Sequence, residues 1–447
     1  MTPPSLDREP VPTGIELEPG IPICQTDLPL DWYQEELKPY AEEYLALPDR
    51  SPETVLPWLD RYVRPAQDHF GDALLLLAHF YMGGEIVKLV ERYGGAVSDS
   101  YALALQARNH PEKKVIVESA VHFMAESVAI LAAEDQTVWI TNPKAGCTME
   151  MLAKDWMVDP VADQLLERYG DELVVVAYMN TSGRLKALAG RTGGAVCTSS
   201  NAHRVVDWAR RDGKKVLFVP DQHLGRNVAD RIGMAQESLV ALPDPQVHGG
   251  GYRLDDGTVR GGVGALDAAE MILWGSSCGV HTIFRPEMAA WWRSHGWRVL
   301  VHPESPLETV RLADVVGSTN VLWRAVVEAE PGERLAIGTE GHFVRNARAE
   351  AARRGVEVMH LADVPEAGYG SAGCGCATMS RNDPPHLAGI LDLLRRDAAP
   401  DLNRVLPGDA VDERTGGRER LTEAERAELV RDARLALERM IAITEAS

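Results

Sequence analysis

Short apolar runs alternate with amphipathic stretches along most of the chain, from about Ala73 onward. Runs such as Leu173–Ala177 are typical of strands that are buried on both faces of a parallel sheet. Many of the stretches between the runs are about ten residues or longer and have helical periodicity. This alternation predicts an α/β fold with parallel sheets. The predicted strands are Ala73–Ala78, Val115–Val117, Val138–Ile140, Leu173–Ala177, Val216–Val219, Met271–Trp274, Val299–Val301, Leu335–Ile337 and Val356–Met359.

Other segments depart from this alternation. Residues 1–30 are rich in Pro and Gly, so we expect irregular structure there. Leu30–Leu47 and Pro52–Tyr62 have helical patterns, and Ser51 stands where the second helix needs an N-cap.

A repeated order of features divides the alternation into three parts. In each part a strand ends in a polar cluster, and these clusters are His79–Tyr81, Tyr178–Ser182 and His302–Ser305. About 16–20 residues later a Ser/Thr turn opens a helix, and these turns are Ser98–Ser100, Thr198–Asn201 and Gly317–Asn320. A further strand and loop then reach one cysteine in each part, namely Cys147, Cys278 and Cys376. Ligands bind at carboxyl strand ends in such sheets, so the repeat predicts three αβα-sandwich domains in pseudo-threefold arrangement around a central site.

The repeat also gives the expected domain boundaries. Residues 1–60 form an N-terminal extension, and residues 61–150 form the first domain. We expect C-terminal helices within residues 380–447 to complete that domain. Residues 151–280 and 281–379 form the second and third domains.

The cysteine of each repeat suggests a metal centre. Three protein thiolates suit a 4Fe–4S cluster, because one of its four irons then keeps an open position. That iron is a Lewis acid able to bind a hydroxyl or carboxylate group and help a hydroxyl leave as water. The sequence lacks the compact Cys-x2-Cys-x2-Cys run of ferredoxins, so such a cluster would need the folded scaffold. A structural zinc ion with three cysteines and one histidine is the alternative.

The remaining cysteines are interpreted differently. Cys197 ends an apolar strand and is predicted to be an inert buried thiol. Cys24 is assigned no role. Cys374 lies in the same glycine-rich turn as Cys376 and could ligate in its place. Six cysteines without a secretory signal favour a reducing compartment, so we expect a cytoplasmic protein.

Composition narrows the classes of partner. The formal net charge of −20 disfavours nonspecific binding to nucleic acid, which needs a basic surface. No run of 18 apolar residues is present, so no membrane span is expected. An anionic substrate would need a locally positive pocket. The Ser/Thr turns could supply one, because helix N-termini offer backbone N–H groups to carboxylates and phosphates.

A series of motifs, taken together, resembles the quinolinate synthase family. The resemblance covers about Ala73 to His386 and is weaker in the C-terminal helix. The motifs are Ala78–Tyr81, Gly95–Ser100, Val121–Ser127, Ala145–Met149, Tyr178–Ser182, Cys197–Asn201, Pro220–Arg226, Trp274–His281, His302–Glu304, Val316–Thr319, Ile337–Glu340 and Cys376–Met379. So many motifs in the family's order identify the chain as a member far better than any single one.

The resemblance implies an activity. Members condense iminoaspartate with dihydroxyacetone phosphate to quinolinate, phosphate and water in de novo NAD biosynthesis. Their fold is three αβα domains around a 4Fe–4S cluster with one open iron, which acts as a Lewis acid. The implied partners are these small substrates, with neither nucleic acid nor membrane. Functional coupling to an L-aspartate oxidase or aspartate dehydrogenase is a further expectation.

The resemblance also implies roles for single residues. The cluster ligands fall on Cys147, Cys278 and Cys376. Glu304 is the expected general base, and Tyr81 and His302 are placed to shuttle protons. The positions expected to bind substrate are His79, Ser100, Tyr178, Asn180, Ser199, Ser200, His281, His302, Glu304, Ser318 and Thr319.

Several features depart from the family pattern. Residues 235–270 form a stretch that is longer than in short members and rich in Gly, so a surface insertion is expected there. Phe80 stands where many members have tyrosine, and the last cysteine motif is Cys-x-Cys, so the choice of Cys376 rests on the Ala-Thr-Met that follows it. Two other functions stay open on the residues alone. One is a cluster hydro-lyase with another substrate, which the Tyr-Met-Asn and His-Pro-Glu motifs disfavour. The other is a noncatalytic metal- or metabolite-binding protein, which would have no use for Glu304 and Tyr81.

Overall fold

The computed structural model describes residues 28–365, 376, 378–412 and 417–446. The chain divides into two compact units. The first consists of residues up to Gly146 together with Met288–Leu300 and Thr319–Glu419. The second consists of Cys147–Glu287, Val301–Ser318 and Arg420–Ser447. No helix in the described ranges is both long enough and apolar enough to cross a membrane.

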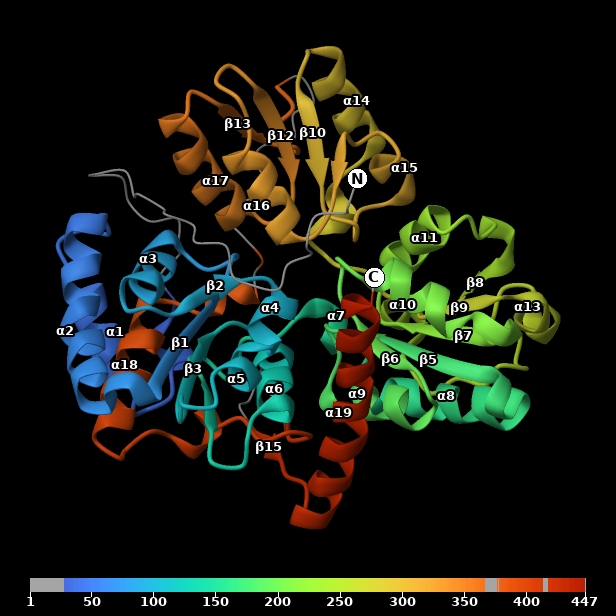
Figure 1. The fold of residues 1–447 in the computed structure, drawn as a ribbon, viewed down its shortest axis with the longest axis horizontal. Coiled ribbons are helices and arrows are strands. Elements are labelled where there is room, and N and C mark those ends of the chain that lie inside the picture. Colours follow the sequence, from blue (N-terminus) through green and yellow to red (C-terminus); the bar gives the residue numbers. More distant parts are fainter. Residues whose placement is uncertain (1–27, 366–375, 377, 413–416, 447) are drawn as a thin grey trace. The chain divides into compact units, whose positions relative to one another are not determined.

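The first unit contains a four-stranded parallel sheet of order β2-β1-β3-β4. Its strands are β1 (Leu74–His79), β2 (Ala96–Ser98), β3 (Val115–Ser119) and β4 (Thr137–Ile140). Figure 1 shows α4–α6 on one face of this sheet and α2, α3 and α18 on the other. The helices are α1 (Lys38–Leu45), α2 (Pro52–Phe70), α3 (Gly84–Arg92), α4 (Ser100–Ala104), α5 (Gln106–Asn109), α6 (His122–Leu131) and α18 (Pro384–Arg395).

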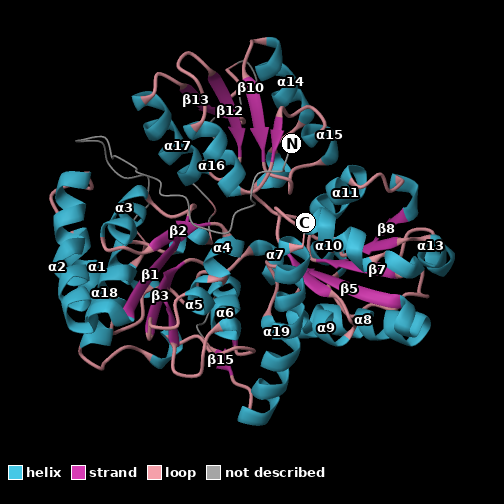
Figure 2. Cartoon of the chain, in the orientation of Figure 1, coloured by secondary structure: helices cyan, strands magenta, loops and turns pink. Residues whose placement is uncertain are grey.

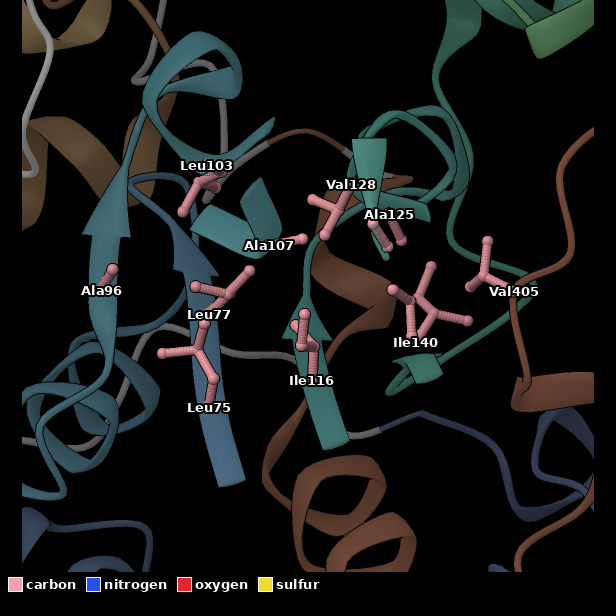
Figure 3. Packing of buried hydrophobic residues seen from close by; sticks show 12 residues of the cluster. Leu75, Leu77, Ala96, Leu103, Ala107, Ile116, Ala125, Val128, Ile140 and Val405 are labelled. Atoms are coloured by element: carbon pink, nitrogen blue, oxygen red, sulfur yellow. The ribbon is translucent and has the colours of Figure 1, made fainter. Parts of the chain in front are cut away.

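Apolar residues of this sheet pack against α4–α6. The strand residues project toward these helices, and they include Leu75, Leu77, Ile116 and Ile140 (Figure 3). The helices add apolar side chains such as Val128 to the same cluster. Because β1, β2 and most of β3 are buried on both faces, their residues can be apolar without alternation. This explains why the apolar runs in the sequence predicted the strands.

The second unit contains a five-stranded parallel sheet of order β6-β5-β7-β9-β8. Its strands are β5 (Leu173–Tyr178), β6 (Ala195–Cys197), β7 (Lys215–Val219), β8 (Leu239–Ala241) and β9 (Met271–Leu273). Figure 2 shows α8 and α9 on one face and α10 and α11 on the other. The helices are α7 (Thr148–Met151), α8 (Asp155–Tyr169), α9 (Gly183–Arg191), α10 (Ala202–Ala209), α11 (Gln222–Arg231), α12 (Pro245–His248), α13 (Gly262–Ala268) and α19 (Glu423–Glu445).

A third sheet has the order β11-β10-β12-β13. Its strands are β10 (Arg298–Val301), β11 (Val315–Val316), β12 (Arg334–Gly338) and β13 (Glu357–His360). Its helices are α14 (Pro286–Ser294), α15 (Leu307–Val310), α16 (Thr319–Val327) and α17 (Gly341–Arg353). A short antiparallel pair, β14 (Ala410–Val411) and β15 (Arg418–Glu419), completes the strands in the described ranges.

Two parts of the repeat share a glycine pair that joins a helix to the next strand. Gly94 and Gly193 have φ of +71° and +75°, which suits the residue after a helix end. A Cβ on the following Gly95 would lie 2.3 Å from the Leu76 carbonyl oxygen, and one on Gly194 would lie 1.9 Å from that of Val175. Only glycine therefore fits at positions 95 and 194, directly before β2 and β6.

The structure confirms the predicted α/β class with parallel sheets, and all of the predicted strands are present. The domain boundaries and the pseudo-threefold arrangement stay predictions. The helices expected to complete the first domain divide between the two units, since α18 packs against α1 and α2 whereas α19 packs against α9 and β6.

Two predictions from the sequence, one about a helix and one about an insertion, were wrong. The expected helix Leu30–Leu47 is a short 3-10 turn, Leu30–Trp32, followed by α1. Pro39 lies in the first turn of α1, where a missing N–H is tolerated, and so marks its start. Residues 235–270 are not only a surface insertion, because β8 within them pairs with β9 and forms one edge of the second sheet.

Candidate functional site

A buried phenol–carboxylate pair lies in the second unit. Tyr178 is the last residue of β5, and Glu304 follows β10 in the His-Pro-Glu segment. The Tyr178 hydroxyl donates a hydrogen bond to Glu304 Oε1 at 2.5 Å. Glu304 is only 2% exposed, so its charge needs partners inside the protein.

Two stacked histidines supply those partners. His281 Nδ1 lies 2.7 Å from Glu304 Oε2, and His302 Nδ1 lies 3.7 Å from the same oxygen. The two imidazole rings stack with centroids 4.4 Å apart. Three expected substrate-binding residues therefore surround the expected general base.

The electrostatics of this group favour an ionised carboxylate. Burial alone would raise the pKa of Glu304, but the charges of His302 and His281 and hydrogen bonds from His281 and Tyr178 outweigh it. The pKa of Glu304 is consequently lowered from its ordinary value of 4.5 to about 2. The carboxylate is thus charged at neutral pH, and the partners that stabilise the charge also make it a weak base while they hold it.

Cys278 joins the group through His281. Its sulfur lies 3.2 Å from His281 Nδ1, and both cysteine and histidine are buried. Cys278, His281 and Glu304 each offer one ligand atom, and these atoms lie within 4.8 Å of one another. A thiolate, an imidazole and a carboxylate so close together could hold a metal ion.

Cys147 has a different neighbour in the same unit. It directly precedes α7, and the Asn180 side-chain amide donates to its sulfur at 3.8 Å. Asn180 lies two residues after the end of β5, so the polar cluster of this strand reaches the cysteine. The structure thus brings a residue of the strand-end cluster next to one of the repeat cysteines.

Cys376 is held in the first unit by a carboxylate. Its backbone N–H donates to Glu340 Oε1 at 2.9 Å, and its sulfur lies 3.1 Å from Thr378 Oγ1. Glu340 in turn lies 2.9 Å from His342 Nδ1. Cys374, the alternative ligand, lies outside the described residues.

His79 and Tyr81 lie together where β1 ends. The Tyr81 backbone N–H donates to His79 Nδ1 at 3.2 Å, and the two rings meet edge to face at 4.6 Å. The Tyr81 hydroxyl lies 2.9 Å from Thr339 Oγ1 in the same unit. The expected proton carrier Tyr81 therefore has a second hydroxyl within hydrogen-bond reach.

The three Ser/Thr turns open helices, as predicted. Ser100 begins α4 and Thr319 begins α16, while Ser199 and Ser200 directly precede the Asn201 N-cap of α10. Ser318 is buried, and its hydroxyl has no hydrogen-bond partner among the described residues. A buried hydroxyl without a partner is costly, so Ser318 is suited to receiving a ligand group.

Comparison with known proteins decides the family. The family model described as Quinolinate synthetase A protein matches residues 65–404. The chain is 37% identical to the quinolinate synthase of Streptomyces coelicolor over 425 residues, which are 94% of this chain and 97% of that protein. The chain belongs to the quinolinate synthase family. Quinolinate synthases of Corynebacterium glutamicum, 35% identical over 87% of this chain and 88% of that protein, and of Halobacterium salinarum, 35% identical over 83% and 91%, agree with this assignment.

The cysteines of this family member differ in their suitability as ligands. Cys147, Cys278 and Cys376 are free of disulfide bonds and begin helical turns, since the carbonyl of each accepts the N–H of the residue four positions later. Cys197 is completely buried in β6, and burial raises the pKa of its thiol well above the ordinary value. Each of the three repeat cysteines therefore offers a thiol of the kind that ligates metal centres, whereas the raised thiol pKa makes Cys197 a poor ligand.

Two carboxylates that bind the backbone of repeat cysteines, Asp221 and Glu340, were not predicted from the sequence. Asp221 accepts the backbone N–H of Cys278 at 3.0 Å, as Glu340 does for Cys376. Both belong to motifs of the family resemblance, and each follows a strand and precedes a helix. That placement signals a helix cap, but it could not reveal that a second oxygen reaches a distant cysteine.

Proposed function

We propose that this chain is a quinolinate synthase that condenses iminoaspartate with dihydroxyacetone phosphate, forming quinolinate, phosphate and water in de novo NAD biosynthesis. The observation that carries the proposal is the buried arrangement of Tyr178, His281 and His302 around the Glu304 carboxylate. It offers a base and proton donors in one water-poor site, which ring construction by successive proton transfers requires. Membership of the family supports the choice of substrates.

The proposed cofactor is a 4Fe–4S cluster held by Cys147, Cys278 and Cys376. When bound through three thiolates, such a cluster supplies one iron that acts as a Lewis acid toward a hydroxyl or carboxylate group. The protein residues around the ligands supply the rest. Asn180 donates toward the Cys147 sulfur, and His281 lies beside the Cys278 sulfur.

Glu304 is the proposed general base. Its two oxygens are occupied by the Tyr178 hydroxyl and by His281, which stabilise the charge and weaken its basicity. A substrate that takes up either partner would leave an oxygen free and strengthen the base where a proton must be removed. His302, next to the same carboxylate, and Tyr81, next to Thr339, are the proposed proton carriers.

The remaining site residues are proposed to bind anionic groups. Imidazoles, amides and hydroxyls at strand ends and helix starts donate hydrogen bonds to carboxylate and phosphate oxygens. Their positions at the ends of β1 and β5, at the start of the 3-10 turn His281–Ile283 and at the starts of α4, α10 and α16 support this role. The residues are His79, Ser100, Tyr178, Asn180, Ser199, Ser200, His281, Ser318 and Thr319.

The testing experiment is an anaerobic assay of quinolinate formation with iron and sulfide analysis on the same samples. Reconstituted wild-type protein should contain about four irons and four sulfides per chain and form quinolinate. Each single alanine variant of the three ligand cysteines should lose both. Cys197→Ala is the matched control and should keep both.

Two results would contradict the proposal. A cluster-loaded protein that forms no quinolinate would contradict the proposed reaction. Stoichiometric zinc with little iron would favour a mononuclear ion, for which the Cys278, His281 and Glu304 group offers ligands.

We further propose that the enzyme acts in the cytoplasm and receives iminoaspartate from an L-aspartate oxidase or aspartate dehydrogenase.

A further inference from the structure

Asp221 makes two backbone contacts that connect a helix start to a cysteine loop. It is fully buried and follows β7, where its Oδ1 accepts the Leu224 N–H at 2.6 Å and so caps α11. Its Oδ2 accepts the Cys278 N–H at 3.0 Å. Capping alone needs only one of these oxygens.

Glu340 repeats the arrangement in the other unit. It is also fully buried and follows β12, where its Oε2 accepts the Phe343 N–H at 3.0 Å and caps α17. Its Oε1 accepts the Cys376 N–H at 2.9 Å. An aspartate and a glutamate, which follow strands of two different sheets, thus each accept one helix-cap N–H and one cysteine N–H.

The first part of the repeat lacks this carboxylate. The loops correspond, because the His122 N–H donates to the Ala145 carbonyl and the Gln222 N–H donates to the Ser276 carbonyl, each two residues before a repeat cysteine. Val121 occupies the helix-cap position that Asp221 occupies in the second part, and it makes no side-chain cap. The repeated carboxylate is therefore not a general requirement for building this loop.

We propose that Asp221 and Glu340 are positioning residues that hold the backbone N–H of Cys278 and of Cys376, and so keep these two cysteines in ligand geometry before the cluster arrives. This inference rests on the proposed cluster ligation by those cysteines. A carboxylate that fixes the N–H of a ligand residue restricts the loop, so less freedom is lost when the sulfur binds iron. Partners that lie behind metal ligands commonly contribute about 10–100-fold to metal affinity.

Asp221→Asn and Glu340→Gln test the inference. An amide keeps one oxygen for the helix cap, which asparagine serves as well as aspartate, but it turns an NH2 group toward the cysteine N–H. Reconstituted variants should lose iron to a chelator about 10–100-fold faster than the wild type. The two variants should also differ in which cysteine becomes more reactive, since each carboxylate holds only one cysteine.

That difference is measured on the protein without its cluster. Thiol alkylation at one fixed pH, followed by mass spectrometry, reports each cysteine separately. In Asp221→Asn, Cys278 should react about tenfold faster while Cys376 keeps its wild-type rate, and Glu340→Gln should show the reverse. A general loss of structure would accelerate every cysteine together, so the selectivity separates positioning from folding.

Asp99→Asn is the matched control, because Asp99 is a buried cap of α4 whose Oδ1 accepts the Ala102 N–H. It should change neither iron loss nor cysteine reactivity. Wild-type rates of both in Asp221→Asn and Glu340→Gln would overturn the inference while leaving the proposed function intact. Failure of the wild-type protein to take up a cluster would instead contradict the proposed function, and the alkylation measurement would still decide whether the carboxylates hold the loops.

Discussion

Glu118 places a carboxyl group inside the apolar core without a partner. It lies in β3, in register with Leu77 and Ile140, and neighbouring residues in register project from the same face of a parallel sheet. Leu77 and Ile140 belong to the core packed against α4–α6. Neither carboxyl oxygen of Glu118 has a hydrogen-bond partner in the described structure, and the side chain is fully buried.

Burial without a partner raises the pKa of Glu118 from 4.5 to about 8. Because the folded pKa lies above the unfolded one, the folded protein retains a proton that the unfolded chain releases between these values. The stabilisation from this proton is complete below about pH 4.5 and is lost as the pH rises through about 8. Since a tenfold change in proton affinity corresponds to about 1.36 kcal/mol, the loss between pH 5 and pH 9 is roughly 4 kcal/mol.

Glu118→Gln should remove this dependence, because glutamine resembles the protonated acid and does not titrate. Urea unfolding of wild type and variant, compared at each pH from 5 to 9, cancels the other titrating groups. The two proteins should have similar stability at pH 5, and the variant should be more stable by roughly 4 kcal/mol at pH 9. The exposed Glu134→Gln removes the same charge without burial and should follow the wild type. Parallel stability curves for wild type and Glu118→Gln would refute the reasoning.

Three further variants test the site and its support. Glu304→Gln should form quinolinate at least about 100-fold more slowly at unchanged iron content, and near-normal turnover would end its assignment as base. Thr319→Val should weaken binding of a dicarboxylate product analogue by roughly 1–3 kcal/mol in calorimetric titration, whereas unchanged affinity would leave it a helix start only. Tyr33→Phe removes the hydroxyl that donates to Asp383 but keeps the ring stacked on His386, and should lower the free energy of unfolding by about 1–3 kcal/mol. An unchanged urea midpoint would contradict that last expectation.

The sheets could be predicted because their central strands are buried on both faces. A strand such as Val216–Val219 has no polar side to obscure its pattern. The edge strand β8 could not be predicted, since it has only three residues, two of them partly exposed, and lies in a Gly-rich stretch. Local pattern carries little information for a short edge strand.

The candidate site was predicted in its residues but not in its contacts. The repeat and the motifs named Tyr178 and Glu304, yet 126 positions separate them in the chain. The pattern placed both at strand ends without indicating that their side chains meet. Asp221 and Glu340 could be recognised only as helix caps, because the second oxygen of each accepts the N–H of a cysteine 57 or 36 positions away.

Helix α19 makes the completion of the second unit depend on residues that are synthesised long after α9 and β6. Its Ala433, Ala436 and Leu437 are fully buried, and α19 packs against α9 and β6. Arg439 donates to the Gly190 and Gly194 carbonyl oxygens, closing the end of α9.

On the ribosome, α9 is complete about 250 residues before the end of α19 is made. Because synthesis proceeds at about 5–20 residues per second, the apolar side of α9 stays exposed for roughly 10–50 s before α19 can pack against it. Nascent chains that pause in this interval expose the same surface that truncated chains would expose permanently. A stop codon after residue 420 should therefore yield aggregation rather than a smaller folded enzyme.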